Sequence, residues 1–299
     1  MGMRVRLIDI DSKIPNLALM QLSTYHKNLG DEVGFDVENP DLVYASCIFD
    51  KNAEVARGVS TMYPEAEVIL GGSGIDIQSK IPEPAQKIKP DYTLYPSVDY
   101  DIGFTTRGCI RKCPFCVVPQ KEGKIHRWQH ISEFHEEGHK EVLLLDNNLY
   151  ADKDWFFQNT DYLLEHNLRV NICQGMDIRI LTEEVAERLA QIKHKNNLLR
   201  FAWDNPKDEE RVFAGLELLK NAGVKSRNIQ FYILTGFDST FEQDKYRCEK
   251  LREAGALCFV MQYRPNEQTR RLARWANKRW IYYSVPFSEY NPNYKRNIT

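Results

Sequence analysis

Short apolar runs alternate with amphipathic segments along the first hundred residues. The runs predict three buried strands, at residues 5–10, 41–49 and 67–70. Residues 16–29 and 52–62 carry apolar side chains at helical spacing, and Gly30 follows the first of these segments as a stop signal. Strands that alternate with helices predict a doubly wound α/β domain with a parallel sheet.

A proline-rich stretch then interrupts the alternation. Pro82, Pro84, Pro90 and Pro96 fall close together, and such a stretch is the best candidate for a domain boundary. We therefore expect a first domain at residues 1–97, a second at 98–265 and a C-terminal helical tail at 266–299.

The alternation resumes after the prolines. The expected strands are residues 102–106, 141–145, 169–173, 198–203, 228–234 and 257–262. Helical patterns lie between them, at residues 182–193, 208–222 and 240–254. Six β/α units predict a partial (β/α)6 barrel of the TIM type, with the functional site at the C-terminal ends of the strands.

Three cysteines follow the first strand of this second half. Cys109, Cys113 and Cys116 have the spacing C-x3-C-x2-C within one predicted loop. Thiolates bind soft metals and iron–sulfur clusters, and three ligands leave one iron of a cubane open. Two alternatives stay open at this point: Cys113 and Cys116 as a thiol–disulfide redox pair, or a zinc site with a fourth ligand such as His126.

Composition narrows the class of protein without identifying a partner. The chain has 299 residues, of which 42% are hydrophobic and 27% are charged, so it has the profile of a globular protein rather than a disordered one. The 40 basic and 42 acidic residues give a formal charge of −2, which does not indicate a general attraction to nucleic acid. Seven cysteines with no export signal and no apolar span predict a cytoplasmic protein without membrane insertion.

The cysteine loop resembles that of the radical S-adenosylmethionine (SAM) enzymes. Cys109, Cys113, Phe115 and Cys116 match the family pattern C-x3-C-x-(aromatic)-C. The resemblance implies a [4Fe–4S] cluster on the three cysteines, with SAM chelated at the open iron. It also implies reductive cleavage of SAM to a 5′-deoxyadenosyl radical that acts on a substrate not yet identified. A one-electron donor such as flavodoxin or ferredoxin is the implied partner.

The same resemblance assigns roles to residues at later strand ends. Asp146 and Asn147 would accept from the SAM ammonium, although Asp146-Asn147-Asn148 stands where the family carries Gly-Gly-Glu. Arg179 would bind the SAM carboxylate, because a guanidinium matches it in two-point geometry. A surface salt bridge is the alternative for Arg179.

Three further positions complete the implied SAM site. Asp204 or Gln174 would bond the ribose hydroxyls, and Gly236 would let the adenine approach the backbone. These positions follow predicted strands, which is also where ordinary turns occur.

The first domain resembles the cobalamin-binding domain that precedes the radical core in one subgroup of the family. Residues 40–46 and 69–72 are the matching stretches, while the lower-ligand pattern Asp-x-His-x-x-Gly is absent. Two alternatives stay open. With cobalamin bound, the expected reaction is methylation of an unactivated carbon. A degenerate domain would serve for docking or as a lid, and hydrogen abstraction would then drive rearrangement, insertion or oxidation.

A histidine-rich stretch spells the metalloprotease pattern His-Glu-x-x-His at residues 135–139. Gly138 predicts the end of a helix there, so we do not expect a zinc site. With His126 and His130, these histidines are expected on a solvated surface helix.

A basic stretch near the C-terminus carries the last candidate surface. Arg270, Arg274 and Lys278 recur every four residues, and apolar residues accompany them at Leu272, Trp275 and Trp280. The segment 270–280 is either a closing helix that packs its tryptophan onto the barrel or a surface for RNA or another nucleic acid. In the competing interpretation of the whole chain, it is a cluster-bearing electron-transfer or nucleic-acid-binding module without turnover.

Overall fold

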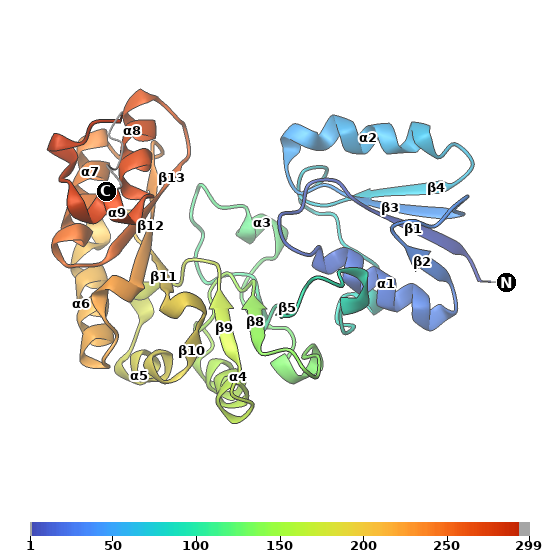
Figure 1. Ribbon diagram of the computed structural model, residues 1–299, viewed down its shortest axis with the longest axis horizontal. Helices are drawn as coiled ribbons and strands as arrows, with labels where there is room; N and C mark the ends of the chain where they lie inside the picture. Colours follow the sequence, from blue (N-terminus) through green and yellow to red (C-terminus); the bar gives the residue numbers. More distant parts are fainter. Residues whose placement is uncertain (1, 293–299) are drawn as a thin grey trace, which may run out of the picture. The chain divides into compact units, whose positions relative to one another are not determined.

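The computed structural model describes residues 2–292 and divides the chain into two compact units, Met1–Leu145 and Asp146–Thr299. Both units are mixed α/β structures with parallel strands (Figure 1). The domain boundary expected at residue 97 stays a prediction.

A four-stranded parallel sheet forms the beginning of the first unit. Its order is β2-β1-β3-β4, with β1 at Arg4–Asp9, β2 at Glu32–Gly34, β3 at Leu42–Ser46 and β4 at Glu67–Gly71. Helix α1 (Leu17–Leu29) packs on β1 and β2, and α2 (Ala53–Met62) packs on β3 and β4, on the opposite face (Figure 1). This order matches the first four strands of flavodoxin-like sheets.

Local sequence signals explain these elements well. Asn16 caps α1 by accepting a hydrogen bond from the Leu19 amide, and Gly30 ends the helix at a φ of 82°. Val5 and Leu7 alternate inward from β1 and are buried in the core. The helices and strands expected for residues 5–70 are thus confirmed, and only the three-residue β2 was not expected.

The rest of the first unit consists of short elements. β5 (Asp101–Gly103) pairs in parallel with β8 (Glu141–Leu144). β6 (Thr106–Arg107) pairs in antiparallel fashion with β7 (His126–Arg127), and the short helix α3 spans Val118–Lys121. The single strand expected at residues 102–106 is therefore wrong in its second half, because the chain leaves β8 after Gly103 and begins a separate ribbon.

The histidine-rich stretch corrects a second expectation. Residues 126–139 form β7, a 3-10 helix at Ile131–Glu133 and a turn at Gly138 with a φ of 99°, so the expected surface helix is wrong. His135 and His139 both donate from Nδ1 to the buried carboxylate of Asp101, at 2.6 and 2.8 Å. This bonding stabilises the N-terminal end of β5 and explains both histidines without a metal.

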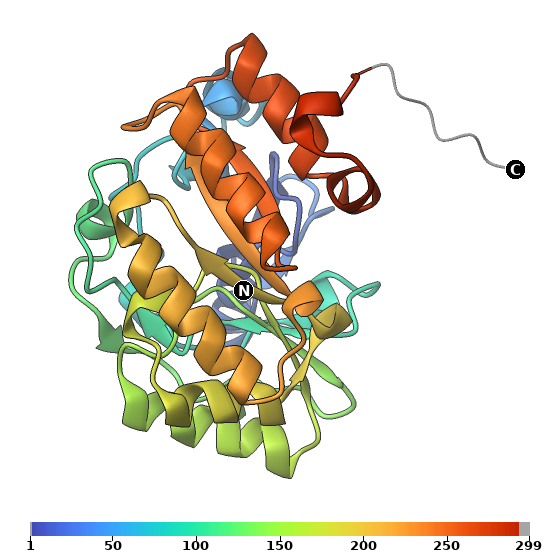
Figure 2. The same ribbon diagram turned by 90° about the vertical axis from the view of Figure 1, so that its left-hand side faces the viewer.

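The second unit continues the β/α alternation. Its strands are β9 (Arg169–Ile172), β10 (Lys193–His194), β11 (Leu199–Ala202), β12 (Ile229–Thr235) and β13 (Leu257–Gln262). The helices between them are α4 (Lys153–Glu165), α5 (Glu183–Gln191), α6 (Glu209–Asn221) and α7 (Phe241–Glu253). β10 pairs with β9, while β11, β12 and β13 form a parallel sheet in that order. Figure 2 shows α6 and α7, in gold and orange, in front of these strands. The expected strands 198–203, 228–234 and 257–262 and helices 182–193, 208–222 and 240–254 are confirmed to within two residues.

Two helices close this unit. α8 (Glu267–Ala276) lies along β13, and α9 (Arg279–Ser284) follows it. The Asn277 side chain accepts from the Val260 amide at 2.7 Å and donates to the Val260 carbonyl at 3.1 Å, so it satisfies the open side of β13. Trp275 is fully buried against Tyr282 and Phe287. Part of the expected tail, residues 293–299, lies outside the described residues.

The longest helices of residues 2–292 have 13 residues. None of the helices in this range has the length and apolar character needed to cross a membrane.

Candidate functional site

The cysteine loop is closed at its base by the β6–β7 ribbon. Thr106 pairs with Arg127, and Arg107 pairs with His126. Gly108 begins the loop at a φ of 79°, and a Cβ atom at this position would lie 2.3 Å from the carbonyl oxygen of Lys124. Only glycine allows this close approach of the two loop ends, so the residue before Cys109 is dictated by geometry.

A buried glutamate holds the same two loop ends together. Glu122 accepts from the Gly108 amide at 2.9 Å and from the Arg107 guanidinium at 2.9 Å, and its side chain is only 8% exposed. Arg107 also stacks over Phe104, with its guanidinium carbon 4.1 Å from the ring centre. The sequence reasoning missed Glu122, which has no motif of its own, although a lone acid 13 residues after the first cysteine could have been tested as a loop anchor.

The three predicted cysteines lie together in this loop and are partly exposed. The Cys116 amide donates to the Cys113 carbonyl at 3.0 Å, so these two residues share one tight turn. The Arg111 amide lies 3.3 Å from Cys109 Sγ, in the position of a hydrogen-bond donor to that sulfur. Backbone donors to sulfur stabilise thiolates and tune iron–sulfur clusters. Phe115 is partly buried within the same turn.

Three soft thiolates on one loop are the donor set of an iron–sulfur cluster. His126 donates from Nδ1 to the Lys124 carbonyl at 3.0 Å, a bond that metal-ligating histidines also make, so the zinc site with His126 stays a prediction. In a cubane the cysteines bind different irons, so three soft thiolates on one loop fit it without meeting at one point.

The end of the cysteine loop contacts the glycine-rich turn after β4. Lys121 in α3 donates to Ser73 Oγ at 2.6 Å, and Gln78 donates to the Gln120 carbonyl at 2.8 Å. Burial lowers the pKa of Lys121, whose ammonium is held between these two segments. The cysteine loop is thus attached to the C-terminal edge of the first sheet.

That edge carries its own network of hydrogen bonds. β1 and β3 are neighbours whose connections run to opposite sides, which is the usual ligand crevice of such sheets. Tyr95 from the proline-rich stretch donates to Asp9 at 2.8 Å and accepts from the Asn16 amide at 3.2 Å. Asn16 in turn donates to Ser46 at 2.8 Å. Burial raises the pKa of Tyr95, so its hydroxyl stays a donor at neutral pH.

The residues at this edge do not fit a corrin. A Cβ at Gly72 would lie 2.2 Å from the Cys47 carbonyl, and one at Gly74 would lie 2.7 Å from the Phe49 backbone. These glycines therefore serve close packing within the chain rather than the approach of a ligand. A corrin at the crevice would have to displace Tyr95 and break its bonds to Asp9 and Asn16.

In the second unit, three of the predicted SAM contacts follow the C-terminal ends of strands. Gln174 follows β9 and is exposed, Asp204 follows β11, and Gly236 follows β12 at a φ of 73°. Asp204 accepts from the Leu234 amide at 3.2 Å, which places it beside the end of β12. Burial raises the pKa of Asp204 above the usual value of a carboxyl group.

A buried arginine that sequence reasoning missed joins these strand ends. Arg247 in α7 is fully buried and donates to the carbonyls of Trp203, Asp204 and Leu234 at 2.6 to 2.9 Å. Asp244 neutralises it at 2.6 Å. Asp244 and Arg247 lie one helical turn apart, at i and i+3. Opposite charges at this spacing, on a helix that should bury one face, could have indicated a buried ion pair.

Arg179 lies in a network of ion pairs. It contacts Asp177 through two nitrogens, at 2.6 and 3.2 Å, and Asp208 at 2.9 Å. These two carboxylates and hydrogen bonds raise the pKa of Arg179 against the effect of its partial burial. A salt bridge was the alternative to SAM binding that we expected for Arg179 from the sequence. A SAM-binding role for Arg179 stays a prediction.

The remaining predicted contacts, Asp146 and Asn147, begin the second unit. Asp146 is buried, and its charge contributes to the raised pKa of Cys173, which is due mainly to burial of that thiol. Arg200 from β11 lies nearby and donates to Asn171 and to the Ile172 carbonyl, both at 3.1 Å. The structure therefore brings Asp146, Cys173 and the cation Arg200 together at the end of β9. The sequence pattern did not predict that Arg200 would lie there.

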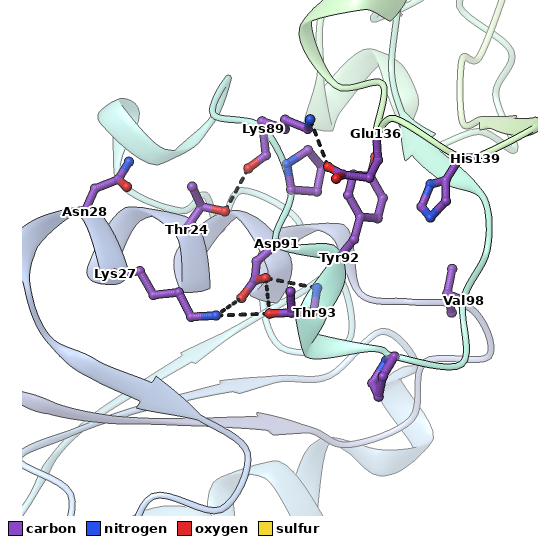
Figure 3. Close-up of a pocket in the computed structure, with 12 residues that line it drawn as sticks. Thr24, Lys27, Asn28, Lys89, Asp91, Tyr92, Thr93, Val98, Glu136 and His139 are labelled. Atoms are coloured by element: carbon purple, nitrogen blue, oxygen red, sulfur yellow. Dashed lines mark hydrogen bonds and ion pairs between the residues drawn. The ribbon is translucent and has the colours of Figure 1, made fainter.

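A separate hollow of about 610 Å³ lies in the first unit, and no cysteine lines it (Figure 3). Its cations are already paired: Lys27 contacts Asp91 at 2.6 Å, and Lys89 contacts Glu136 at 2.9 Å. Burial acts to raise the pKa of Asp91, but hydrogen bonds from Lys27, Ser23 and Thr93 outweigh it and hold the pKa below its usual value. We assign no ligand to this hollow.

Comparison with known proteins adds a likeness of fold. The sequence matches no family model. It matches no curated protein either. Among solved structures it matches the radical SAM methyltransferase TsrM from Kitasatospora setae, with a TM-score of 0.60 and 13% identity over 88% of this chain and 75% of that one. The fold is similar to that of a radical SAM methyltransferase. At this identity the likeness concerns the fold; the TsrM structure itself has cobalamin and a [4Fe–4S] cluster bound.

Proposed function

We propose that this protein is a radical SAM enzyme whose cluster is held by Cys109, Cys113 and Cys116. The observation that carries the proposal is the cysteine loop, in which three soft donors share one loop closed by Gly108 and Glu122. The similarity of fold to a radical SAM methyltransferase supports it independently. The partial (β/α)6 barrel expected from the sequence belongs to the same proposal.

When bound, the cluster and SAM would supply a 5′-deoxyadenosyl radical that takes a hydrogen atom from the substrate. The residues of the chain would bind and orient these groups and shield them from solvent. Asp204 would hold the ribose hydroxyls, Gly236 would admit the adenine, and Gln174 and Asn147 would offer further polar contacts. The buried Arg247 keeps the ends of β11 and β12 in place for these contacts.

The proposal contains no cobalamin-dependent step. The crevice between β1 and β3 is crossed by Tyr95, and Gly72 and Gly74 are packed against the chain itself. Hydrogen abstraction without a methyl carrier is therefore the outcome we propose, in preference to radical methylation. Incubation with hydroxocobalamin followed by gel filtration tests this: retention of the corrin absorbance with the protein would overturn it.

A soluble one-electron carrier such as flavodoxin or ferredoxin is the proposed partner, acting in the cytoplasm. Ile110 and Val117 beside the cysteines are 44% and 51% exposed. Such apolar side chains around an exposed loop suit the small, transient contacts of electron-transfer partners.

The test is anaerobic reconstitution with iron and sulfide, followed by SAM and dithionite. We expect a brown protein that forms 5′-deoxyadenosine. Cys113→Ala should lose the chromophore and all SAM cleavage, because two thiolates do not hold the cluster, whereas the buried Cys248→Ala should keep the iron.

The competing outcome is also defined. An intact cluster in the unmodified protein without any 5′-deoxyadenosine would indicate an electron-transfer or nucleic-acid-binding module and would overturn the enzyme proposal. Stoichiometric zinc in anaerobically purified protein would overturn the cluster itself.

A further inference from the structure

Three basic side chains follow one another along α8 and the turn after it: Arg270 and Arg274 lie in α8, and Lys278 precedes α9. Arg270, Arg274 and Lys278 are exposed and line a hollow of about 390 Å³ together with Gln262 and Asn277. The residues that line the hollow come from β13, from α8 and from the turn after α8, and α8 runs along β13. Arg270 and Arg274 are one helical turn apart, about 6 Å along the axis. Lys278 continues the row in the turn between α8 and α9.

These three cations have no acidic partner among residues 2–292, in contrast to the paired lysines of two other helices. Lys220 contacts Glu217 at 2.7 Å and Lys250 contacts Glu253 at 3.9 Å within their own helices. Surface ion pairs of this kind cancel the local field. A row of unpaired positive charge in a chain whose formal charge is −2 is thus a local feature, not a result of composition.

An exposed ring lies beyond the C-terminal end of β13, where the Gln262 side chain meets Thr269 at the beginning of the row. Tyr263 directly follows β13 and is 45% exposed, with its ring packed edge-on against Phe237 at 4.9 Å. Rings fixed by packing on one side and open on the other are platforms on which bases stack.

We propose that the α8 hollow binds the phosphate backbone of a single-stranded nucleic acid, so that the substrate of the proposed radical SAM reaction is a nucleotide within such a strand. The substrate part of this inference rests on the proposed function; the binding part does not. Cations about one helical turn apart match successive phosphates of one strand, while Tyr263 offers a stacking surface to an unpaired base. A duplex hides its base faces and would leave the ring unused.

The binding test uses the full chain without SAM, so that it is independent of cluster chemistry. Fluorescence anisotropy is measured with labelled RNA and DNA strands of mixed sequence, about 20 nucleotides long, over a range of salt concentrations. The test variant is Arg270→Ala/Arg274→Ala/Lys278→Ala. The matched control is Lys220→Ala/Lys245→Ala/Lys250→Ala, which removes the same charge from paired positions.

We expect the α8 variant to bind at least about tenfold more weakly than the control in about 0.1 M salt. Its slope of log K against log salt should be smaller by about 2, since each phosphate contact on a single strand contributes about 0.7. Tyr263→Ala should weaken binding at least about fivefold, and Tyr263→Phe should not. Binding of either strand supports the site. Tighter binding of RNA or of DNA shows which sugar the site prefers, and equal binding shows that it prefers neither.

Three results would overturn the proposal. The first is that the unmodified protein binds neither RNA nor DNA strands. The second is that the α8 variant binds as tightly as the control variant. The third is that polyglutamate of equal charge displaces the labelled strand as well as an unlabelled strand does. Failure of 5′-deoxyadenosine formation with binding intact would count against the proposed function alone. Retained SAM cleavage without binding would count against the α8 hollow alone.

Discussion

Single residues with unusual surroundings set the geometry of the cysteine loop, and Gly108 is the clearest of them. We expect Gly108→Ala to lower the free energy of unfolding by more than about 2 kcal/mol, because the left-handed backbone and the contact with the Lys124 carbonyl both oppose a Cβ. The reconstituted protein should also hold less than half of the usual iron.

The matched control for this change is Gly123→Ala. Gly123 has a similar φ of 75°, but a Cβ atom added there would meet no other atom within 4 Å. Gly123→Ala should lower the free energy of unfolding by only about 1 kcal/mol, which is the penalty of the left-handed backbone conformation alone. Equal losses in urea unfolding for the two variants would show that the close approach to Lys124 does not matter.

At the scale of residues, local chemistry was predictable and long-range contacts were not. The spacing of Cys109, Cys113 and Cys116 is contiguous in sequence, and the structure keeps the three in one loop. Asp208, which pairs with Arg179, and Asp101, which accepts from two histidines, lie far along the chain from their partners, so no local pattern reveals these contacts.

Among the elements, α7 connects most directly to the candidate site, through Arg247. We expect Arg247→Ala to lower the free energy of unfolding by about 3 to 5 kcal/mol, because it leaves Asp244 and three carbonyls buried without their donor. Urea unfolding measures this loss, and Lys245→Ala, in an exposed pair at 4.0 Å on the same helix, should change it by less than about 0.5 kcal/mol.

A second variant keeps this prediction testable if Arg247→Ala does not fold. Arg247→Lys retains the charge but not the planar group that reaches carbonyls of two strands, so an intermediate loss is expected. A lysine variant as stable as the unmodified protein would show that the charge alone, rather than the bridging of β11 and β12, explains the burial.

Elements of regular length could be predicted because their signals are local. α7 begins with a capping box between Thr240 and Gln243, and α1 ends at Gly30. Strands β6, β7 and β10 have two residues each. Two residues are too few to show an alternating hydrophobic pattern, so the sequence could not predict these strands. The surface helix expected around His135 failed for a different reason, since the buried Asp101 holds both histidines in a turn.

For the molecule as a whole, one buried histidine links folding to pH. Burial lowers the pKa of His194 to about 4, and its Nε2 donates to the Leu189 carbonyl at 2.7 Å. The unfolded chain binds a proton below about pH 6.5, whereas the folded protein does so only near pH 4. The contribution of this group to stability should therefore be constant above about pH 6.5 and fall by about 3 kcal/mol as the pH drops to about 4.

Urea unfolding at about pH 7.5, 5.5 and 4.5 measures this slope. His194→Gln, which gains no proton, should remove the contribution, while His166→Gln on the exposed end of α4 should keep it. The idea fails if the His194 variant and the unmodified protein lose stability in parallel.

Whole-molecule features were the hardest to predict, because they depend on contacts between distant segments. The boundary that the prolines indicate near residue 97 stays a prediction, and the compact units of the structure divide between Leu145 and Asp146. Tyr95, which lies in the proline-rich stretch, bonds to Asp9 and Asn16, which are 86 and 79 residues away along the chain. A composition shift marks where a chain changes character, and it does not show which segments then fold together.

The small contact between Asn277 and Val260 has a consequence for the protein at high concentration. An outermost strand with unpaired amide and carbonyl groups is a template on which identical chains stack into fibrils. The Asn277 side chain satisfies both groups of Val260, and α8 shields the rest of β13. One amide side chain thereby occupies the backbone groups of Val260 that another chain would need for pairing, beside the exposed apolar side chains of Phe259 and Met261.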